Sequence, residues 1–182
     1  TKLMMRRKNL YFPIFERTLA KYGLPDELKY LSIIESGLHP RAISRARAVG
    51  LWQFMSGTGR YYGLHNDWYI DERMDPVKST DAACRYLRDL YIMFNDWELA
   101  LAAYNTGPGN VKRAIRRAGY KRSFWEIYPF LPRETRSYVP QFVAITYTMN
   151  HLDEHNFIDE GEEMLVEADT IQVKKFLHFE TF

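Results

Sequence analysis

The chain has 182 residues, of which 46% are apolar and 26% charged, and this is the composition of a soluble globular protein with one ordinary domain. Its net charge of +2 argues against a nucleic-acid-binding surface built on bulk positive charge. The single cysteine, Cys84, excludes an intrachain disulfide, and no stretch approaches the ~18–20 apolar residues of a membrane-spanning helix.

An amphipathic helix is predicted over about residues 9–22, because apolar side chains recur there at helical spacing. Pro13 is tolerated only near the first turn of a helix, so it sets the predicted start, and Gly23 is a suitable break at the other end. A second, short helix is predicted from Pro25 to Glu35, with acidic residues in its first turn.

Glu35 stands out because it follows an apolar run and precedes a small-residue break, Ser36-Gly37. Unpaired carbonyls give the end of a helix partial negative charge, and both this charge and burial raise the pKa of a carboxylate. A raised pKa is what a general acid needs near neutral pH. Glu35 is therefore a catalytic candidate, and a solvated glutamate at a helix end is the ordinary alternative.

The next part of the chain is predicted to be irregular. Ser56 or Thr58 is expected to cap a short helix that Gly63 ends. Residues 64–78 are rich in Asp, Asn and Pro and are interpreted as a surface connection. Residues 36–51 keep apolar side chains that would pack across the domain, namely Leu38, Ile43, Val49 and Leu51.

Three helices are predicted after this connection. Residues 79–94 carry one apolar stripe, in which Cys84 is interpreted as a small buried hydrophobe. Residues 97–104 form an Ala-rich helix whose small side chains would permit close packing. Asn110 is expected to cap a third helix, which runs to about Ala118.

The last predicted helix covers residues 133–151, with a kink or a new first turn at Pro140. From residue 153 the sequence is acidic and less periodic, so we predict a domain of residues 1–152 and a tail or linker of residues 153–182. The predicted fold class is mostly α, with a short acidic C-terminal extension.

Three further clusters place polar side chains among apolar ones. Gln53 lies within the apolar stretch at residues 50–55, Tyr104 and Asn105 precede a glycine turn, and Tyr138 precedes Val-Pro. Each has an ordinary interpretation by itself. Gln53 would be a satisfied polar residue, Asn105 a turn former, and the tyrosines core residues with a hydrated hydroxyl.

In this order, the clusters resemble the motifs of lytic transglycosylases of the soluble-murein-transglycosylase (SLT) family, and within it the group around membrane-bound lytic murein transglycosylase D. The resemblance covers about residues 10–151, and four ordered motifs are specific where one alone is weak. The family's Glu-Ser, Gly-Leu-(Met/Trp)-Gln, Ala-Tyr-Asn and late-tyrosine elements match Glu35-Ser36, residues 50–53, residues 103–105 and Tyr138. The chain departs from many relatives at Trp52, Phe54 and Met55, which are expected to reshape sugar subsites.

The resemblance implies a lysozyme-like helical fold and a peptidoglycan lytic transglycosylase. Such an enzyme cleaves the bond between N-acetylmuramic acid and N-acetylglucosamine without water and leaves 1,6-anhydromuramoyl ends. Glu35 would act as general acid and then as base, and Tyr138 would hydrogen-bond its carboxyl group. The substrate-binding residues carried over by the resemblance, together with Phe54 and Met55, are Ser36, Gln53, Phe54, Met55, Tyr104, Asn105 and Tyr138.

The mechanism needs one carboxylate, whereas ordinary glycoside hydrolysis uses two. The acids that we considered as a partner of Glu35 stand in polar stretches or at helix starts: Asp26, Glu27, Asp67, Asp71, Glu72, Asp75, Asp96 and Glu98. A lysozyme-type muramidase, which delivers water, and a non-catalytic glycan-binding module on the same fold remain alternatives. His151 and His155 are four residues apart and could share a metal ion, but we interpret them as part of a solvated helix end, which the sequence favours by far.

Two further groups of residues each allow two interpretations. The arginines at 41, 45 and 47 are interpreted as a solvated face, and the other interpretation is contact with the peptide stem or lactyl group of the substrate. The aromatic connection at residues 124–128 would either wall the sugar groove or belong to the core.

The expected partner is the glycan strand of peptidoglycan, with no cofactor, metal or nucleic acid, and a monomer is expected. Peptidoglycan implies the periplasm or cell envelope. Because the chain starts at Thr1 without an apolar signal region, we expect trimming from a longer precursor, and the resemblance suggests an outer-membrane lipid anchor there.

Overall fold

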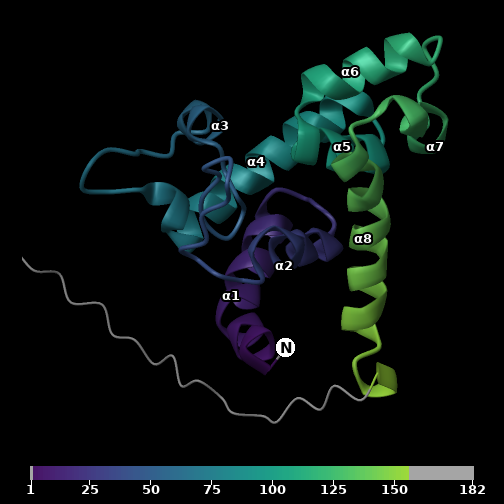
Figure 1. Cartoon of the computed structure of the whole chain (residues 1–182). Coiled ribbons are helices and arrows are strands. Elements are labelled where there is room, and N and C mark those ends of the chain that lie inside the picture. Colours follow the sequence, from purple (N-terminus) through teal and green to yellow (C-terminus); the bar gives the residue numbers. More distant parts are fainter. Residues whose placement is uncertain (1, 156–182) are drawn as a thin grey trace, which may run out of the picture.

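A computed structural model describes residues 2–155 of the chain, and this part is helical without a β-sheet, as predicted. Figure 1 shows α4, α5 and α8 as the frame of the molecule, with α1 and α2 packed inside it. The α-helices are α1 (Lys2–Lys21), α2 (Leu31–Ser36), α3 (Ser56–Tyr61), α4 (Pro76–Phe94), α5 (Trp97–Thr106), α6 (Pro108–Arg117), α7 (Phe124–Ile127) and α8 (Arg133–Asn150). Within residues 2–155, three 3-10 turns lie between helices, η1 (Asp26–Tyr30), η2 (Glu72–Met74) and η3 (Tyr128–Phe130), and η4 (Asp153–His155) follows α8.

Helix α1 begins earlier than predicted, and Pro13 lies inside it. A proline within a helix removes one backbone hydrogen bond, the one to the carbonyl four residues back. Pro13 and Asn9 are both exposed, so water can bind that carbonyl. The opposite face is buried, and Phe15 packs edge-on against Trp52 with the ring centroids 5.0 Å apart. Core packing therefore keeps α1 helical on both sides of Pro13, although helix propensity alone would place Pro13 in the first turn.

Glu35 lies in the last turn of α2, as predicted, although the element opens as the 3-10 turn η1 instead of an α-helix. Gly37 ends α2 in the left-handed region, with φ of 58°. Its N–H donates to the carbonyl of Ile33, and the N–H of Leu38 donates to Ser32. This left-handed turn stops the helix directly after Glu35 and Ser36.

Residues 37–55 are irregular and cross the domain as predicted, with Leu38, Val49 and Leu51 fully buried. Ile43 was predicted to pack and is instead 63% exposed. Ile43 and Val49 form an isolated antiparallel bridge, and Val49 also bridges Phe54. Val49 therefore lies between two neighbouring segments, whereas Ile43 lies at the outer edge of the three and meets solvent.

The central helices confirm the predicted apolar pattern. Asp75 caps α4 by accepting hydrogen bonds from the N–H groups of Val77 and Lys78, so α4 starts just before the predicted residue 79. Cys84 is completely buried, and burial raises the pKa of its thiol to about 12. The alanines of α5 are buried as well, and α5 packs against α4, α6 and α8.

Two predicted caps are wrong. Helix α3 starts at Ser56 itself after Met55, so neither Ser56 nor Thr58 caps it. Helix α6 starts at Pro108, and Asn110 lies within its first turn, where its amide donates to the carbonyl of Thr106. The rigid φ of proline explains the earlier start. The connection at 64–78 contains η2 and the first residues of α4.

Helix α8 is continuous through Pro140, whose ring is exposed to solvent. Beyond it the structure describes only η4, so most of the predicted tail, residues 156–182, lies outside the described residues, and the domain boundary at 152 stays a prediction. Among residues 2–155, none of the helices has the length and apolar character that crossing a membrane requires.

Candidate active site

A cleft lies between α2, the irregular segment, α5 and α8, and it holds most of the predicted site residues. Its volume is about 550 Å³. A neighbouring cavity of about 220 Å³ continues it toward α3 and α4, and the two share Gln53, Met55, Tyr104 and Asn105. The main cleft is lined by Ile34, Glu35, Ser44, Ala46, Ala48, Gln53, Met55, Tyr104, Asn105, Glu134, Ser137, Tyr138 and Gln141.

Glu35 is the acid at the centre of this cleft. The residue keeps some contact with the open space, but its carboxyl group is largely withdrawn from solvent, and this burial raises the pKa to about 7. The hydroxyl of Tyr138 donates to Oε1 of Glu35, which opposes the rise, and the charge of Glu134 adds to it. A carboxyl group with this pKa is protonated in a large fraction of molecules at neutral pH and can donate a proton.

Two tyrosines, Tyr138 and the partly buried Tyr104, hold fixed positions around Glu35. Tyr138 comes from the second turn of α8 and is 4% exposed. Tyr104 comes from α5, and its hydroxyl donates to the carbonyl of Trp52 at 2.8 Å. Burial, first of all, raises the pKa of both phenols well above the usual value, so both remain neutral donors at any physiological pH.

The Gly-Leu-Trp-Gln element at residues 50–53 forms the floor, and its backbone explains its composition. Gly50 has a φ of 88°, and a Cβ there would lie 1.9 Å from the carbonyl oxygen of Arg73, so only glycine fits. Gln53 has a φ of 47°, which is uncommon for a residue with a side chain. Its amide nitrogen donates to the carbonyls of Gly50 at 2.9 Å and Ala42 at 3.3 Å. The amide oxygen remains as an acceptor for a ligand in the cleft.

Asn105 lies within α5, in its last turn, and not in the turn that the sequence suggested. Its side-chain oxygen accepts a hydrogen bond of 2.9 Å from Thr135 of α8. Because the oxygen is engaged, the amide N–H groups of Asn105 are the part that can reach a substrate in the cleft.

Ser36 is not among the residues that line the cleft. Its hydroxyl lies 3.0 Å from the carbonyl oxygens of Ser32 and of Leu51, so it ties the end of α2 to the floor. Phe54 is 2% exposed, and it lines only the smaller cavity. Met55 is exposed and lines both parts of the cleft. Of these three, Met55 has the position that a sugar-contacting residue needs.

Glu134 was missed by the sequence reasoning, and it lines the same cleft as Glu35. It lies four residues before Tyr138 on α8, so both side chains project from one face of the helix. That spacing was a signal which could have identified it. Several other acids considered as partners of Glu35 are engaged elsewhere: Asp71 with Arg73, Glu72 with Lys78, Asp75 at the start of α4 and Asp96 at the start of α5.

The arginines at 41, 45 and 47 do not line the cleft, and all three are exposed. The residues that do line it, Ser44, Ala46 and Ala48, alternate with them. These residues form a turn, closed by hydrogen bonds between Ser44 and Ala48 and between Ser44 and Arg47, and the arginines lie on its solvent side. The structure thus fits the solvated interpretation of these three residues.

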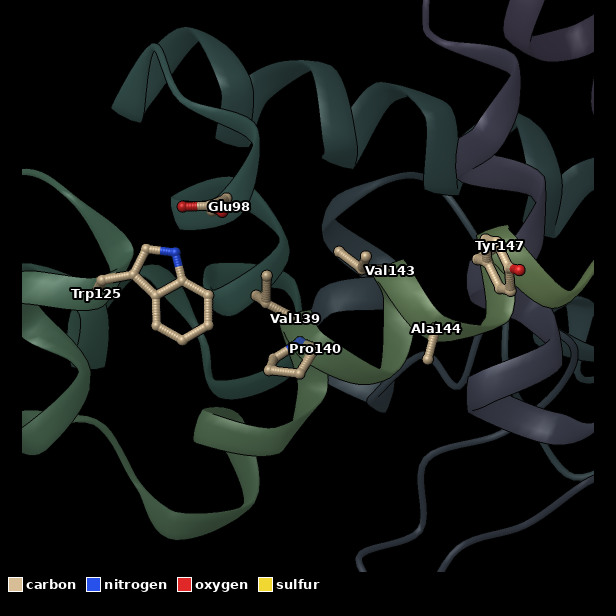
Figure 2. A pocket seen from close by; sticks show the side chains of 7 residues that line it. All are labelled: Glu98, Trp125, Val139, Pro140, Val143, Ala144 and Tyr147. Carbon is tan, nitrogen blue, oxygen red and sulfur yellow. The ribbon is translucent and has the colours of Figure 1, made fainter.

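The aromatic connection does not wall the cleft. Phe124 and Ile127 are fully buried in the core, and Trp125 lines a separate cavity of about 460 Å³. Figure 2 shows this cavity, whose lining is almost entirely apolar and comes largely from α8, including Val143 and Tyr147. It shares none of its lining residues with the cleft around Glu35.

Histidine side chains do not gather at the cleft in the part of the chain that the structure describes. His151 stacks on Tyr147 with the ring centroids 4.3 Å apart, and its Nδ1 lies 2.8 Å from the carbonyl of Tyr147. His155 contacts the same ring from its edge. Within residues 2–155, no three or more His, Cys, Asp or Glu side chains are arranged to hold a metal ion.

Comparison with known proteins places these features in a family. Residues 12–127 match the transglycosylase SLT domain. The chain is 43% identical over 130 residues to membrane-bound lytic murein transglycosylase D of Escherichia coli K12, an alignment that covers 69% of this chain and 28% of the relative. The sequence resemblance to this family is thereby confirmed.

The fold agrees with solved structures. The 70-kDa soluble lytic transglycosylase of Escherichia coli superposes with a TM-score of 0.65 and 26% identity, over 77% of this chain and 24% of that one. An inactive mutant of lytic transglycosylase Slt from Pseudomonas aeruginosa carries glutamine in place of a glutamate. It superposes with a TM-score of 0.63 and 25% identity, over 76% of this chain and 24% of that one. The chain spans about a quarter of the length of these relatives. It belongs to the transglycosylase SLT domain family and has its lysozyme-like helical fold.

Proposed function

We propose that this protein is a peptidoglycan lytic transglycosylase in which Glu35 is the single acid and base. The observation that carries the proposal is a buried carboxyl group with a pKa of about 7, bound by Tyr138, at the centre of an open cleft. The family supports this activity, and the relative from Pseudomonas aeruginosa is inactive when a glutamate is replaced by glutamine.

The reaction needs two proton transfers at one carboxyl group. Protonated Glu35 donates to the glycosidic oxygen as the bond between N-acetylmuramic acid and N-acetylglucosamine breaks. The ionised carboxylate then removes the proton from the C6 hydroxyl of the same muramic acid while that oxygen bonds to C1. The product is a 1,6-anhydro ring, and the intramolecular attack replaces the second catalytic group by positioning.

The other residues act on the N-acetyl group and on Glu35. The free amide oxygen of Gln53 is an acceptor suited to an acetamido N–H, and the amide of Asn105 is a donor suited to an acetamido carbonyl. Tyr138 stabilises the ionised form of Glu35, which exists between the two proton transfers. Tyr104 fixes the floor through Trp52.

A muramidase that uses water is the competing function, and Glu134 is the observation that favours it. A second carboxylate in the cleft is what hydrolysis requires. Glu134 is exposed at the surface, however, where it lacks the burial that sets the pKa of Glu35. We therefore assign it an electrostatic effect on Glu35 and no proton transfer.

Mass spectrometry of the fragments released from purified sacculi tests the proposal. Wild-type protein is expected to release muropeptides with 1,6-anhydro ends. Glu35→Gln is expected to release none while its circular dichroism spectrum stays unchanged. Reducing muramic ends would instead show a hydrolase. Unchanged function in Glu35→Gln would show a glycan-binding module.

The remaining assignments follow from the substrate. Peptidoglycan strands are the proposed partner, which implies action in the periplasm or cell envelope. Action as a monomer stays a proposal. An N-terminal lipid anchor, as the resemblance suggests, stays a proposal.

A further inference from the structure

The connection between α3 and α4 carries a projecting tip whose apolar side chains meet solvent. It leaves the helical body beyond α3 and returns at η2 (Figure 1). Trp68 is 93% exposed and Tyr69 90% exposed, and Ile70 beside them is exposed as well. Sequence reasoning treated this stretch as a polar surface connection. Three consecutive large apolar side chains that avoid the core indicate a surface that meets another partner.

The tip is held rigidly by its own hydrogen bonds. Oδ1 of Asp67 accepts from the N–H groups of Tyr69 at 2.7 Å and Ile70 at 2.8 Å. The N–H of Asp67 donates to the carbonyl of Ile70 at 2.9 Å. Oδ2 of Asp67 lies 2.8 Å from Nε2 of His65. The aromatic side chains are thus presented on a fixed turn.

The base of the tip is fastened to the core. Asn66 and Asp71 form an antiparallel bridge. Arg73, which is buried, binds both carboxylate oxygens of Asp71, at 2.8 Å and 2.6 Å. The same guanidinium donates to the carbonyl of Phe54 at 3.1 Å. Arg73 therefore connects the base of the tip, at Asp71, to the backbone at Phe54, next to the floor of the cleft.

The polar groups of the tip decide which partner it fits. Recognition of a sugar needs free hydrogen-bonding side chains beside an aromatic face, but Asp67, His65 and Asn66 are occupied by one another or by Asp71. The backbone N–H groups of Tyr69 and Ile70 are bonded to Asp67, so they do not lose a partner when the turn enters a medium with little water. Tryptophan and tyrosine are also the residues that favour the interface between a bilayer and water.

We propose that Trp68, Tyr69 and Ile70 insert into the interfacial layer of a lipid bilayer and hold the catalytic domain against a membrane. Around the tip, Asp71 is paired with Arg73 and Glu72 with Lys78, and Asp67 lies against the ring of His65, so no excess of positive charge is present there. The tip therefore has little net charge to attract anionic lipids, and its binding depends on apolar contact. The proposal does not depend on the chemistry at Glu35.

Vesicle binding tests the tip directly. The full chain is mixed with vesicles of phosphatidylethanolamine and phosphatidylglycerol at millimolar lipid, because one short apolar tip binds weakly and reversibly. We expect cosedimentation that persists in high salt, and quenching of tryptophan fluorescence by brominated lipid that is lost in Trp68→Phe. The double variant Trp68→Ser, Tyr69→Ser is expected to bind about tenfold more weakly or worse.

Trp125→Ser is the matched control, since Trp125 is also an exposed tryptophan, at 59%, but lies beside α8. It is expected to bind vesicles as the wild type does. Absence of vesicle binding by the wild type, equal binding by the double variant, or loss of binding in high salt would each overturn the proposal. If the double variant keeps vesicle binding but loses binding to sacculi in the Glu35→Gln background, the tip contacts glycan instead.

Discussion

Tyr138 of α8 and Glu35 of α2 are 103 residues apart in the sequence and are joined by a hydrogen bond inside the cleft. The phenol donates, so the bond is strongest when Glu35 is ionised. Burial acts in the opposite direction and favours the protonated acid. The two effects together hold the pKa of Glu35 at about 7, where one group can both give and take a proton.

Replacing Tyr138 by phenylalanine should separate these effects. Without the phenol, the ionised form of Glu35 loses its donor, so the pKa rises further and the alkaline limb of the pH–rate profile moves to higher pH. Loss of one hydrogen bond to a charged group should also lower kcat about 10- to 100-fold. Turnover of sacculi between about pH 5 and 9 measures both changes.

Tyr104→Phe is the control for that experiment, because Tyr104 donates to Trp52 and not to Glu35. Its alkaline limb should stay where the wild-type limb lies, at a pH of about 7. A limb that moves equally in both variants would contradict the assigned role of Tyr138.

Glu35→Gln should make the protein more stable in alkaline solution. The pKa of Glu35 is raised by folding from 4.5 to about 7, so the ionised form favours the unfolded chain. The stability that the raised pKa of Glu35 contributes is complete below about pH 4.5 and is lost as the pH rises to about 7, by at most about 3 kcal/mol. Urea denaturation at about pH 4 and pH 9 should show the variant equal to the wild type at the first pH and more stable at the second.

An exposed acid on the turn before α2, Glu27, provides the comparison. Glu27→Gln should change stability by less than about 0.5 kcal/mol at both pH values. If the two variants respond alike, burial of Glu35 is not the cause of the pH dependence.

Gly50→Ala should unfold or strongly destabilise the protein, by about 3 kcal/mol or more. The added Cβ would lie 1.9 Å from the carbonyl oxygen of Arg73, and that backbone has little freedom to move. Thermal and urea denaturation measure the loss.

Gly63→Ala is the matched variant, because Gly63 also has a positive φ, 85°, but has no atom within 4 Å of the position that a Cβ would take. It should cost only about 1 kcal/mol, from backbone strain alone. Equal losses in the two variants would show that the close approach to Arg73 has no effect.

Glu134→Gln should move the alkaline limb of the pH–rate profile to lower pH, because the charge of Glu134 raises the pKa of Glu35. Anhydro products should persist, since no proton transfer is assigned to Glu134. The exposed Glu126 on α7 gives a control, Glu126→Gln, in which the limb should not move. Loss of all product in Glu134→Gln, with folding intact, would make it a catalytic partner and support the muramidase alternative.

The features that could be predicted from sequence are those with local causes. Glu35 followed by Ser36-Gly37 identified both a helix end and an unusual carboxylate, because glycine ends helices by a local backbone conformation. Apolar periodicity identified α4, α5 and α8 for the same reason.

The features that could not be predicted depend on tertiary contacts. Pro13 stays inside α1 because the buried face of that helix holds it. Gln53 takes a positive φ that nothing in its neighbours requires. Glu134 enters the cleft only because α8 turns one face toward α2. Trp68 and Tyr69 looked like part of a polar loop, and the structure leaves them without a core to enter.

Two helices are hydrogen-bonded to the floor of the cleft. The hydroxyl of Ser36 in α2 donates to the carbonyl of Leu51, and the hydroxyl of Tyr104 in α5 donates to the carbonyl of Trp52. Adjacent peptide groups of one short segment therefore set the spacing of the two helices that these side chains come from. The gap between those helices is fixed before any sugar enters. Under the proposed function, a glycan strand must conform to this fixed cleft, and the distortion of the proposed reaction falls on the muramic acid ring.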